Sequence, residues 1–358
     1  MTTQHFMEGA PRNKRVLGAR ELFERALSGN VRARADLQEA LSTSDFPYLL
    51  AAGYDRELIA AYGAITPVWP LYATRRTVPN FKDRTLIDLL GGRAGLNKVK
   101  EGAEYKSRGV TESKKTFKVE KFGDIIPLTW EMFVNDDLGA FADLPNRLAV
   151  AARETEERNA ASVFFNAAGT GLSTWADARD VSSATLSSTT LQAGIDAVSQ
   201  RTDGDGRPVL TSDLVLMVPP ALSQTAANIL NTTEVRTGSG SSAPGDTRTI
   251  AGNGLSVTPK LVVNPWLAVV GAGYASMSKM WALLPDPNTA RPHIVSGFLA
   301  GHETPDLRVQ NSAGMRVGGG LVDPLEGSFE NDTIRYRVRH EHGAAALWDD
   351  ALYIGIGA

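Results

Sequence analysis

Histidine residues near the C-terminal end are the side chains whose spacing could support chemistry. His340 and His342 stand two residues apart in a stretch that reads as a β-strand, with Glu341 between them. Because alternate residues of a strand share a face, both imidazoles could bind one metal ion. The sequence offers no third ligand or general base nearby, and no helical HExxH pattern. A metal site is therefore an open alternative, and packed or exposed strand histidines are the interpretation that we favour.

Other catalytic and cofactor-binding signatures are missing from the sequence. Gly271-Ala272-Gly273 opens like a dinucleotide-binding loop, but Ser276 occupies the position of the third glycine. The chain has neither GxxxxGK[ST] nor GxSxG, and it has no cysteine, which excludes disulfides, thiolate ligands and cysteine nucleophiles. The paired acids Asp136-Asp137 and Asp349-Asp350 are interpreted as helix caps or solvated surface. We therefore expect no catalytic residue, no cofactor and no bound metal.

Composition indicates a folded protein without the excess of basic residues that is typical of nucleic-acid-binding proteins. The 358 residues include 37 basic and 40 acidic side chains, a formal net charge of −3, and 42% hydrophobic residues. Proteins that grip duplex DNA usually carry a basic surplus that neutralises phosphates. No secretory signal is recognisable at the N-terminus, and the apolar run Leu261–Val270 is interrupted by Asn264 and Pro265. Tight nucleic-acid binding is therefore not expected.

Hydrophobic periodicity predicts the elements that position these residues. Helical spacing covers residues 16–42 and a longer helix at 143–166, with Asp143 as its N-cap. In that second helix we assign Glu156 and Glu157 to the polar, solvent-facing side. From Phe46 to Leu96 we expect an extended arm rather than a regular helix.

Shorter elements follow along the rest of the chain. Thr189 and Gln192 fit a capping box for one short helix, and Pro219-Pro220 opens another that runs to Leu230. Strands are predicted at Leu214–Val218, Leu261–Val263, Ala268–Val270, His293–Leu299, Thr333–His340 and Leu352–Ile356.

Residues 98–128 predict a long two-stranded hairpin. Thr116–Lys121 alternates with period two after a turn-prone Ser107-Arg108-Gly109. Between Lys98 and Lys121 there are eight basic and four acidic residues. Such a ribbon has too little apolar surface to be stable in water by itself, so we expect it to lie on another molecule. A solvated surface hairpin is the alternative.

Four groups of segments resemble, in their order, the major capsid proteins of tailed double-stranded DNA bacteriophages with the HK97-type fold, in the branch related to prohead protease–capsid fusions. They correspond to the entry to an N-terminal arm, the extended hairpin (E-loop), the turn into a spine helix, and the closing strands. The segments are Ser44–Leu50; Glu101–Tyr105 with Lys121–Thr129; Asn135–Phe141 with Asp143–Ala149; and Trp281–Pro287, Phe298–Gly301 and Arg337–Ala344.

The resemblance implies an α+β subunit with an N-terminal arm, an E-loop, a peripheral domain and an axial domain. It implies these limits: arm and start of the peripheral domain 45–96, E-loop 97–128, peripheral domain 129–205 with spine helix 143–166, axial domain 206–284, peripheral strands 285–348, and a C-terminal strand 349–358. The N-terminal helical segment 1–44 is predicted from periodicity and lies outside the resemblance. Gly238–Pro244 is expected as an exposed loop of the axial domain.

The function implied is self-assembly into the icosahedral head shell that encloses the phage genome. The partners would be copies of the same chain, in hexamers and pentamers, with scaffolding, portal and decoration proteins as further candidates. Assembly would take place in the host bacterial cytoplasm, and the mature location would be the virion. The candidate inter-subunit contacts are Lys106, Lys114, Lys115, Lys118 and Lys121. An encapsulin-like nanocompartment shell and a metal-dependent hydrolase using His340 and His342 are the alternatives.

Overall fold

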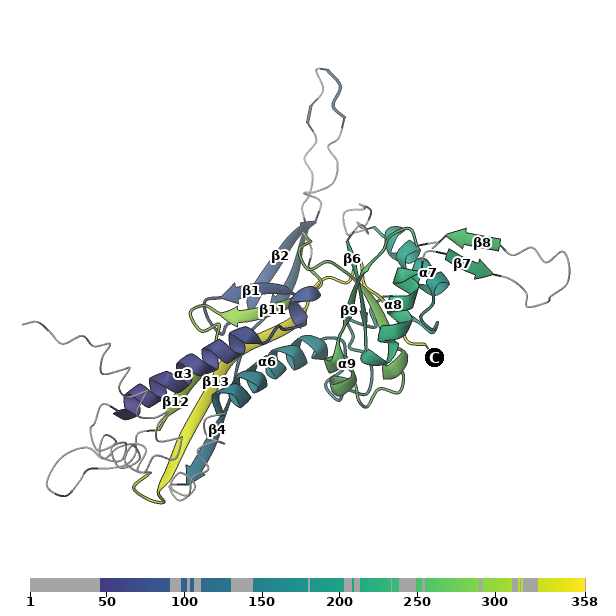
Figure 1. Cartoon of the computed structure of the whole chain (residues 1–358). Helices are drawn as coiled ribbons and strands as arrows, with labels where there is room; N and C mark the ends of the chain where they lie inside the picture. The colour runs from purple at the N-terminus through teal and green to yellow at the C-terminus, as the bar shows by residue number, and fades with distance from the viewer. Residues whose placement is uncertain are drawn as a thin grey trace, which may run out of the picture. The chain divides into compact units, whose positions relative to one another are not determined.

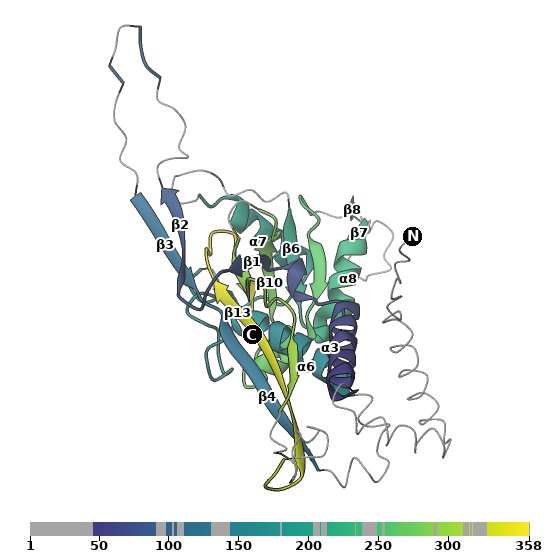
Figure 2. The ribbon, with the colours of Figure 1, turned by 90° about the vertical axis from the view of Figure 1, so that its left-hand side faces the viewer.

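The computed structural model describes much of the chain from Phe46 onward. The residues described are 46–90, 98–101, 104–105, 111–129, 144–179, 181–202, 208, 213–232, 234–237, 249–252, 255–289, 292–310, 315, 317 and 328–357. Figures 1 and 2 show helices and strands mixed along the chain, which confirms the predicted α+β class. The predicted helix at 16–42 and the loop 238–244 lie outside these residues. No helix in the described ranges combines the length and apolarity needed to cross a membrane.

The helices include three single 3-10 turns. They are α3 (Phe46–Ala64), η1 (Trp69–Leu71), α6 (Leu144–Ser162), α7 (Ser188–Ser199), η2 (Pro220–Leu222), α8 (Ser223–Asn231), α9 (Pro265–Val270) and η3 (Met277–Lys279).

The strands form sheets of five or two members. They are β1 (Thr74–Val78), β2 (Arg84–Leu90), β3 (Thr111–Phe117), β4 (Glu120–Thr129), β5 (Val181–Ser182), β6 (Leu214–Val218), β7 (Glu234–Thr237), β8 (Thr249–Gly252), β9 (Lys260–Val263), β10 (Trp281–Pro285), β11 (Ile294–Leu299), β12 (Asp306–Val309), β13 (Thr333–Ala346) and β14 (Tyr353–Gly355).

The chain divides into two compact units. Unit 1 takes its residues from 1–64, 123–150 and 305–339, and unit 2 takes its residues from 65–122, 151–304 and 340–358. Helix α6 and strands β4 and β13 each contribute residues to both units.

Unit 1 has its core on one face of helix α3. Leu58 and Tyr62, four residues apart and thus on the same helix face, are both buried. Leu58 belongs to one apolar cluster with Leu148 of α6 and Ile334 of β13. The expectation of an extended arm from Phe46 is therefore wrong for 46–64. Pro47 does not oppose the helix because it lies in the first turn, where its missing N–H has no helical partner to lose.

Unit 2 is centred on a five-stranded sheet with the order β5-β14-β10-β6-β9. Strand β6 is buried along its whole length. Its alternate residues enter two different apolar clusters, Val215 and Met217 in one and Leu216 and Val218 in the other. A strand covered on both faces needs an unbroken apolar sequence, so the prediction of a buried strand at 214–218 is confirmed.

Helix α7 covers one face of this sheet through Leu191, Ile195 and Val198. Its capping box is formed by Ser187 and Thr190 and not by the predicted Thr189 and Gln192. Gln192 instead donates to Asp196 at 2.6 Å and to Ser256 at 2.9 Å.

A second five-stranded sheet has the order β1-β11-β13-β12, with β4 also paired to β13; Figure 2 shows β4 and β13 side by side. Gly343 of β13 has no room for a side chain, because a Cβ atom would collide with the carbonyl oxygen of Lys118. The backbone that links β3 to β4 therefore lies directly against β13.

The apolar segment 268–270 is helical and not the predicted strand. Asn264 caps helix α9 by accepting a hydrogen bond from the Trp266 amide at 2.9 Å, and Pro265 occupies the first turn. This Asn-Pro pair is a helix-start signal that outweighs the β-propensity of the following valines.

Candidate functional site

A two-stranded antiparallel ribbon extends from the rest of unit 2 (Figure 1). Strand β2 pairs with β3 from Arg84 opposite Phe117 to Leu90 opposite Thr111. The sequence placed both hairpin strands after Lys98, so the position of the first strand was wrong. The second strand ends at Phe117, and the period-two pattern beyond it belongs to β4, which pairs with β13.

Most of the ribbon side chains that the structure describes, those of residues 84–87 and 114–117, are exposed. Among the described strands, neither β2 nor β3 pairs with a third strand. Ile87 is 54% exposed, and Thr85, Lys114 and Thr116 are also exposed. A free two-stranded ribbon is marginally stable in water, so this surface is suited to contact with another molecule.

The base of the ribbon is anchored in the core of unit 2. Phe117 and Val119 are buried in one cluster with Val295 and Leu299. The Phe117 ring lies against Gly297 of β11, where a Cβ atom would overlap it. The anchor explains how a ribbon with exposed sides is held in a defined place at its root.

The candidate contact lysines differ in their surroundings. Lys114 is exposed opposite Ile87, Lys115 is half-buried opposite Leu86, and Lys121 is exposed on β4. Lys106 lies outside the described residues.

Lys118 already has an acidic partner within its own chain. Its Nζ lies 2.6 Å from Glu120 Oε1. The pKa of Lys118 is raised by the hydrogen bond to Glu120, by the charge of Glu120 and by that of Asp83. Because the pair is solvent-exposed it adds little stability, but it lowers the charge that Lys118 presents to a neighbour.

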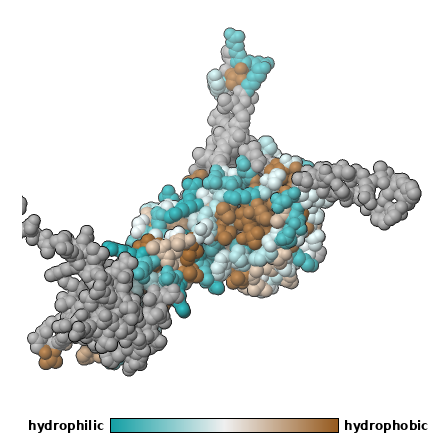
Figure 3. All heavy atoms as spheres, in the orientation of Figure 1, coloured by the Kyte–Doolittle hydropathy of each residue, from teal (hydrophilic) through white to brown (hydrophobic). Residues whose placement is uncertain are grey.

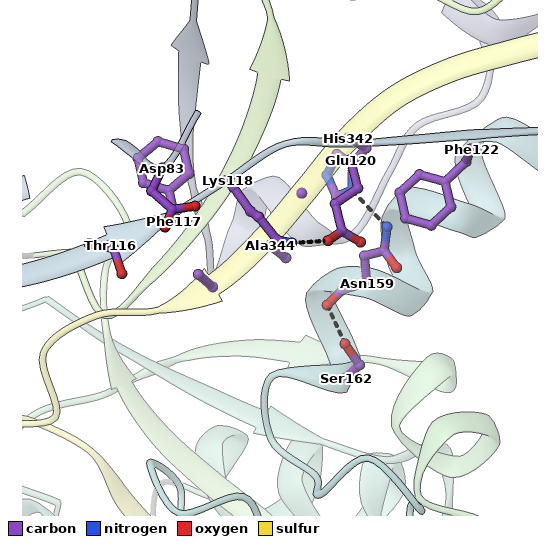
Figure 4. A pocket seen from close by; sticks show the side chains of 12 residues that line it. Asp83, Thr116, Phe117, Lys118, Glu120, Phe122, Asn159, Ser162, His342 and Ala344 are labelled. Carbon is purple, nitrogen blue, oxygen red and sulfur yellow. Dashed lines mark hydrogen bonds and ion pairs between the residues drawn. The ribbon is translucent and has the colours of Figure 1, made fainter. Parts of the chain in front are cut away.

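A cavity of about 460 Å³ opens beside the base of the ribbon, and Figure 4 shows its lining. The Lys118–Glu120 pair lies on one side, and Asn159 and Ser162 of helix α6 lie on another. His342 of β13 also borders the cavity. Among the charged residues of the lining, Lys118 and Glu120 form an ion pair, and Asp83 is the third.

The two histidines singled out by the sequence lie in the protein interior. His340 and His342 are stacked with ring centroids 6.4 Å apart and planes 10° apart. His340 Nε2 lies 2.9 Å from Glu156 Oε1. His342 Nε2 lies 2.7 Å from Ser296 Oγ, and its Nδ1 lies 3.2 Å from Asn159 Nδ2.

These contacts do not favour the metal-site alternative. Within the described part of the chain, no three histidine, aspartate or glutamate side chains gather around a possible ion. The Ser296–His342 contact has the distance of a nucleophile and its base, but both residues are 0% exposed. Burial lowers the pKa of His342 to about 4, so the imidazole is a weak base as well as an inaccessible one.

Two glutamates assigned to the solvent face of helix α6 are buried, which corrects that expectation. Glu156 is 0% exposed and Glu157 is 5% exposed. Glu156 accepts from the Trp69 indole at 2.9 Å and pairs with Arg153 at 3.1 Å. Glu157 accepts from the backbone amides of Val68 and Trp69. The pKa of Glu157 is raised, because the effect of burial exceeds that of the two amides, which lower it.

A second exposed surface lies over helix α9. Figure 3 shows hydrophobic residues, in brown, gathered in the middle of this face of the molecule. Val269 is 50% exposed, Ala268 and Ala272 are exposed, and the Arg158 guanidinium lies over the Trp266 ring at 5.5 Å. No charged residue occurs from Leu261 to Ser278. Interfaces between proteins are enriched in tryptophan and arginine and poor in lysine and acids at their centre, as this surface is.

Comparison with protein families decides the class of the chain. A family model described as phage capsid protein matches residues 112–354. The chain belongs to this phage capsid protein family. The matched residues include β4, α6, β13 and nearly all of the sheet β5-β14-β10-β6-β9, whereas β1 and β2 precede the match. No curated protein matches the sequence.

Solved structures resemble this chain at low sequence identity. A structure from Mycobacterium phage Adephagia has 15% identity and a TM-score of 0.41, covering 79% of this chain and 85% of that one. One from Gordonia phage Cozz has 12% identity and a TM-score of 0.47, covering 81% and 86%. The capsid of a native GTA particle has 11% identity and a TM-score of 0.46, covering 82% and 91%.

The family match confirms the predicted function, a bacteriophage capsid shell protein, and places the chain in the virion capsid. It favours a structural role over catalysis. It does not favour the encapsulin-like or hydrolase alternatives.

Proposed function

We propose that this capsid protein is the major subunit of an icosahedral tailed-phage head, and that its β2–β3 ribbon lies on a neighbouring copy. The observation that carries the proposal is a ribbon of two strands with exposed sides and a firmly buried root. A chain that is made to cover a neighbour needs such an element, since its stability is completed only by assembly.

The apolar surface over α9 supports the same function. A capsid subunit is surrounded by copies of itself, and closed shells repeat each contact at every subunit. The absence of charge from 261 to 278 does not suit contact with DNA phosphates and suits a second protein surface. Repetition of modest contacts around closed rings makes dissociation slow.

We also propose the domain limits and partners that the HK97-type resemblance implies. Residues 206–284 would form the axial domain, and the peripheral domain would include helix α6. The subunits would group as hexamers and pentamers and enclose double-stranded DNA without reading its sequence. Scaffolding, portal and decoration proteins are the further partners, with assembly in the host cytoplasm.

The ribbon lysines provide the test. We expect the triple variant Lys114→Glu, Lys115→Glu and Lys118→Glu to remain a folded subunit and to form no shells. Electron microscopy would score the particles, and circular dichroism would confirm the fold.

A matched control reverses Arg335 and Arg337, two exposed residues of β13 that lie outside the ribbon and the α9 surface. Shells of normal appearance from the triple variant would contradict the proposed role of the ribbon charges. Equal loss from the control would show that any added negative charge blocks assembly.

A further inference from the structure

Helix α6 is attached to the sheet beneath it through polar side chains in the interior of unit 2. Glu156 and Asn159 project from α6, and His340 and His342 project from β13. Ser296 of β11 completes the contacts of His342. We call these five residues the α6 clasp. All of them except Asn159 are buried, and Asn159 is half-buried at the edge of the cavity in Figure 4.

The hydrogen bonds of His342 require a neutral imidazole. The Asn159 side-chain amide nitrogen donates to Nδ1, which must therefore carry a lone pair. The proton then resides on Nε2 and is donated to Ser296 Oγ at 2.7 Å. A protonated ring would direct a second N–H at the Asn159 amide nitrogen, so the present bond would be lost and the amide would have to turn its oxygen toward Nδ1 to replace it.

The surroundings of His342 give little support to a positive charge. The edge of the ring meets Phe298, with centroids 5.1 Å apart at 67°. Glu156 favours the charged form, but it is also engaged by Arg153, Trp69 and His340. The other charged or titratable groups in this part of unit 2 are Glu157 on α6, Glu341 beside it on β13, and Asp83, Lys118 and Glu120 around the cavity.

We infer that the α6 clasp is sensitive to pH. Its hydrogen bonds hold helix α6 against β13 while His342 is neutral, and protonation of the imidazole in mild acid weakens this contact. The inference concerns the folded subunit and does not depend on the proposed ribbon contact. It gives the capsid protein a built-in response to pH.

The direction of the pH effect follows from the contacts and agrees with the lowered pKa of His342, about 4 against 6.5 for the free side chain. The stability that depends on a neutral His342 is fully present above pH 6.5 and is lost as the pH falls from 6.5 toward 4. At pH 4 this one site should favour unfolding by about 100-fold relative to pH 7.

The test compares urea unfolding of the purified full chain and its His342→Gln variant at pH 7, 6, 5 and 4. A glutamine side chain can bond Asn159 and Ser296 but cannot take up a proton in this range. We expect the variant to lack about 100-fold of the acid-induced increase in unfolding. His302→Gln is the matched control, because His302 is exposed, and it should keep the wild-type pH dependence.

A second variant provides an independent test if His342→Gln fails to fold. Asn159→Asp places a carboxylate beside Nδ1, which stabilises the imidazolium, so the acid loss should become smaller than in the wild type. Parallel pH curves for the wild type and either variant would overturn the inference. So would a directly measured His342 pKa near 6.5.

Discussion

The β2–β3 ribbon and the α6 clasp differ in where their charged side chains lie, exposed to solvent in the first and buried in the second. On the ribbon, charges such as Lys114 and Lys118 face solvent while one aromatic residue, Phe117, holds the root. In the clasp, Glu156 is buried and satisfied by partners from other elements. The comparison separates charges that are held inside the fold at α6 from charges that are exposed near the ribbon, where we propose contact with a neighbouring copy.

Loss of a buried carboxylate should have the largest effect. Glu156→Ala would leave the Trp69 indole, Arg153 and His340 without their shared acceptor, and we expect a loss of about 4 kcal/mol in the free energy of unfolding. Glu154→Ala, an exposed glutamate on the same helix, should change it by less than about 0.5 kcal/mol. Urea unfolding at pH 7 measures both. Equal midpoints for the two variants would remove the distinction between clasp and surface charge.

The root of the ribbon should be nearly as sensitive. Phe117→Ala leaves a cavity against Gly297 and Val295, and we expect a loss of about 3 kcal/mol. Ile87→Ala on the same ribbon removes an exposed side chain and should cost less than about 0.5 kcal/mol in the isolated subunit. If both substitutions cost the same, the ribbon is not anchored as described.

A substitution on the exposed side of helix α9 should block shell assembly without changing the stability of the subunit. Val269→Asp is expected to change the free energy of unfolding of the subunit by less than about 0.5 kcal/mol, because the side chain is 50% exposed, and to abolish shells. Val150→Asp on α6 is the matched control, since Val150 is 44% exposed. Electron microscopy and sedimentation would measure the outcome. Normal shells from Val269→Asp would exclude the α9 surface from the contacts between copies.

The sequence predicted those helices and strands whose formation depends on residues close together in the chain. The unbroken apolar run of β6 and the helical period of α6 both led to elements that the structure contains. Helices α3 and α9 were not predicted, although each has a proline near its start. In both cases it lies in the first turn, where it is tolerated.

The clasp could not be predicted, because its partners are distant in sequence. Trp69 is 87 residues from Glu156, and His340 is 184 residues away. A glutamate among arginines on a long helix reads as a solvated residue until those partners are known. The spacing of His340 and His342 correctly placed both on one face, but only the fold reveals that this face is buried against α6.

Cryo-electron microscopy of particles formed by the expressed chain tests the central claim most directly. The account predicts closed shells in which residues 84–90 and 111–117 of each subunit lie on a neighbouring copy while Phe117 stays in its own core. A ribbon folded back onto its own subunit, or a chain that remains a compact monomer under assembly conditions, would contradict it.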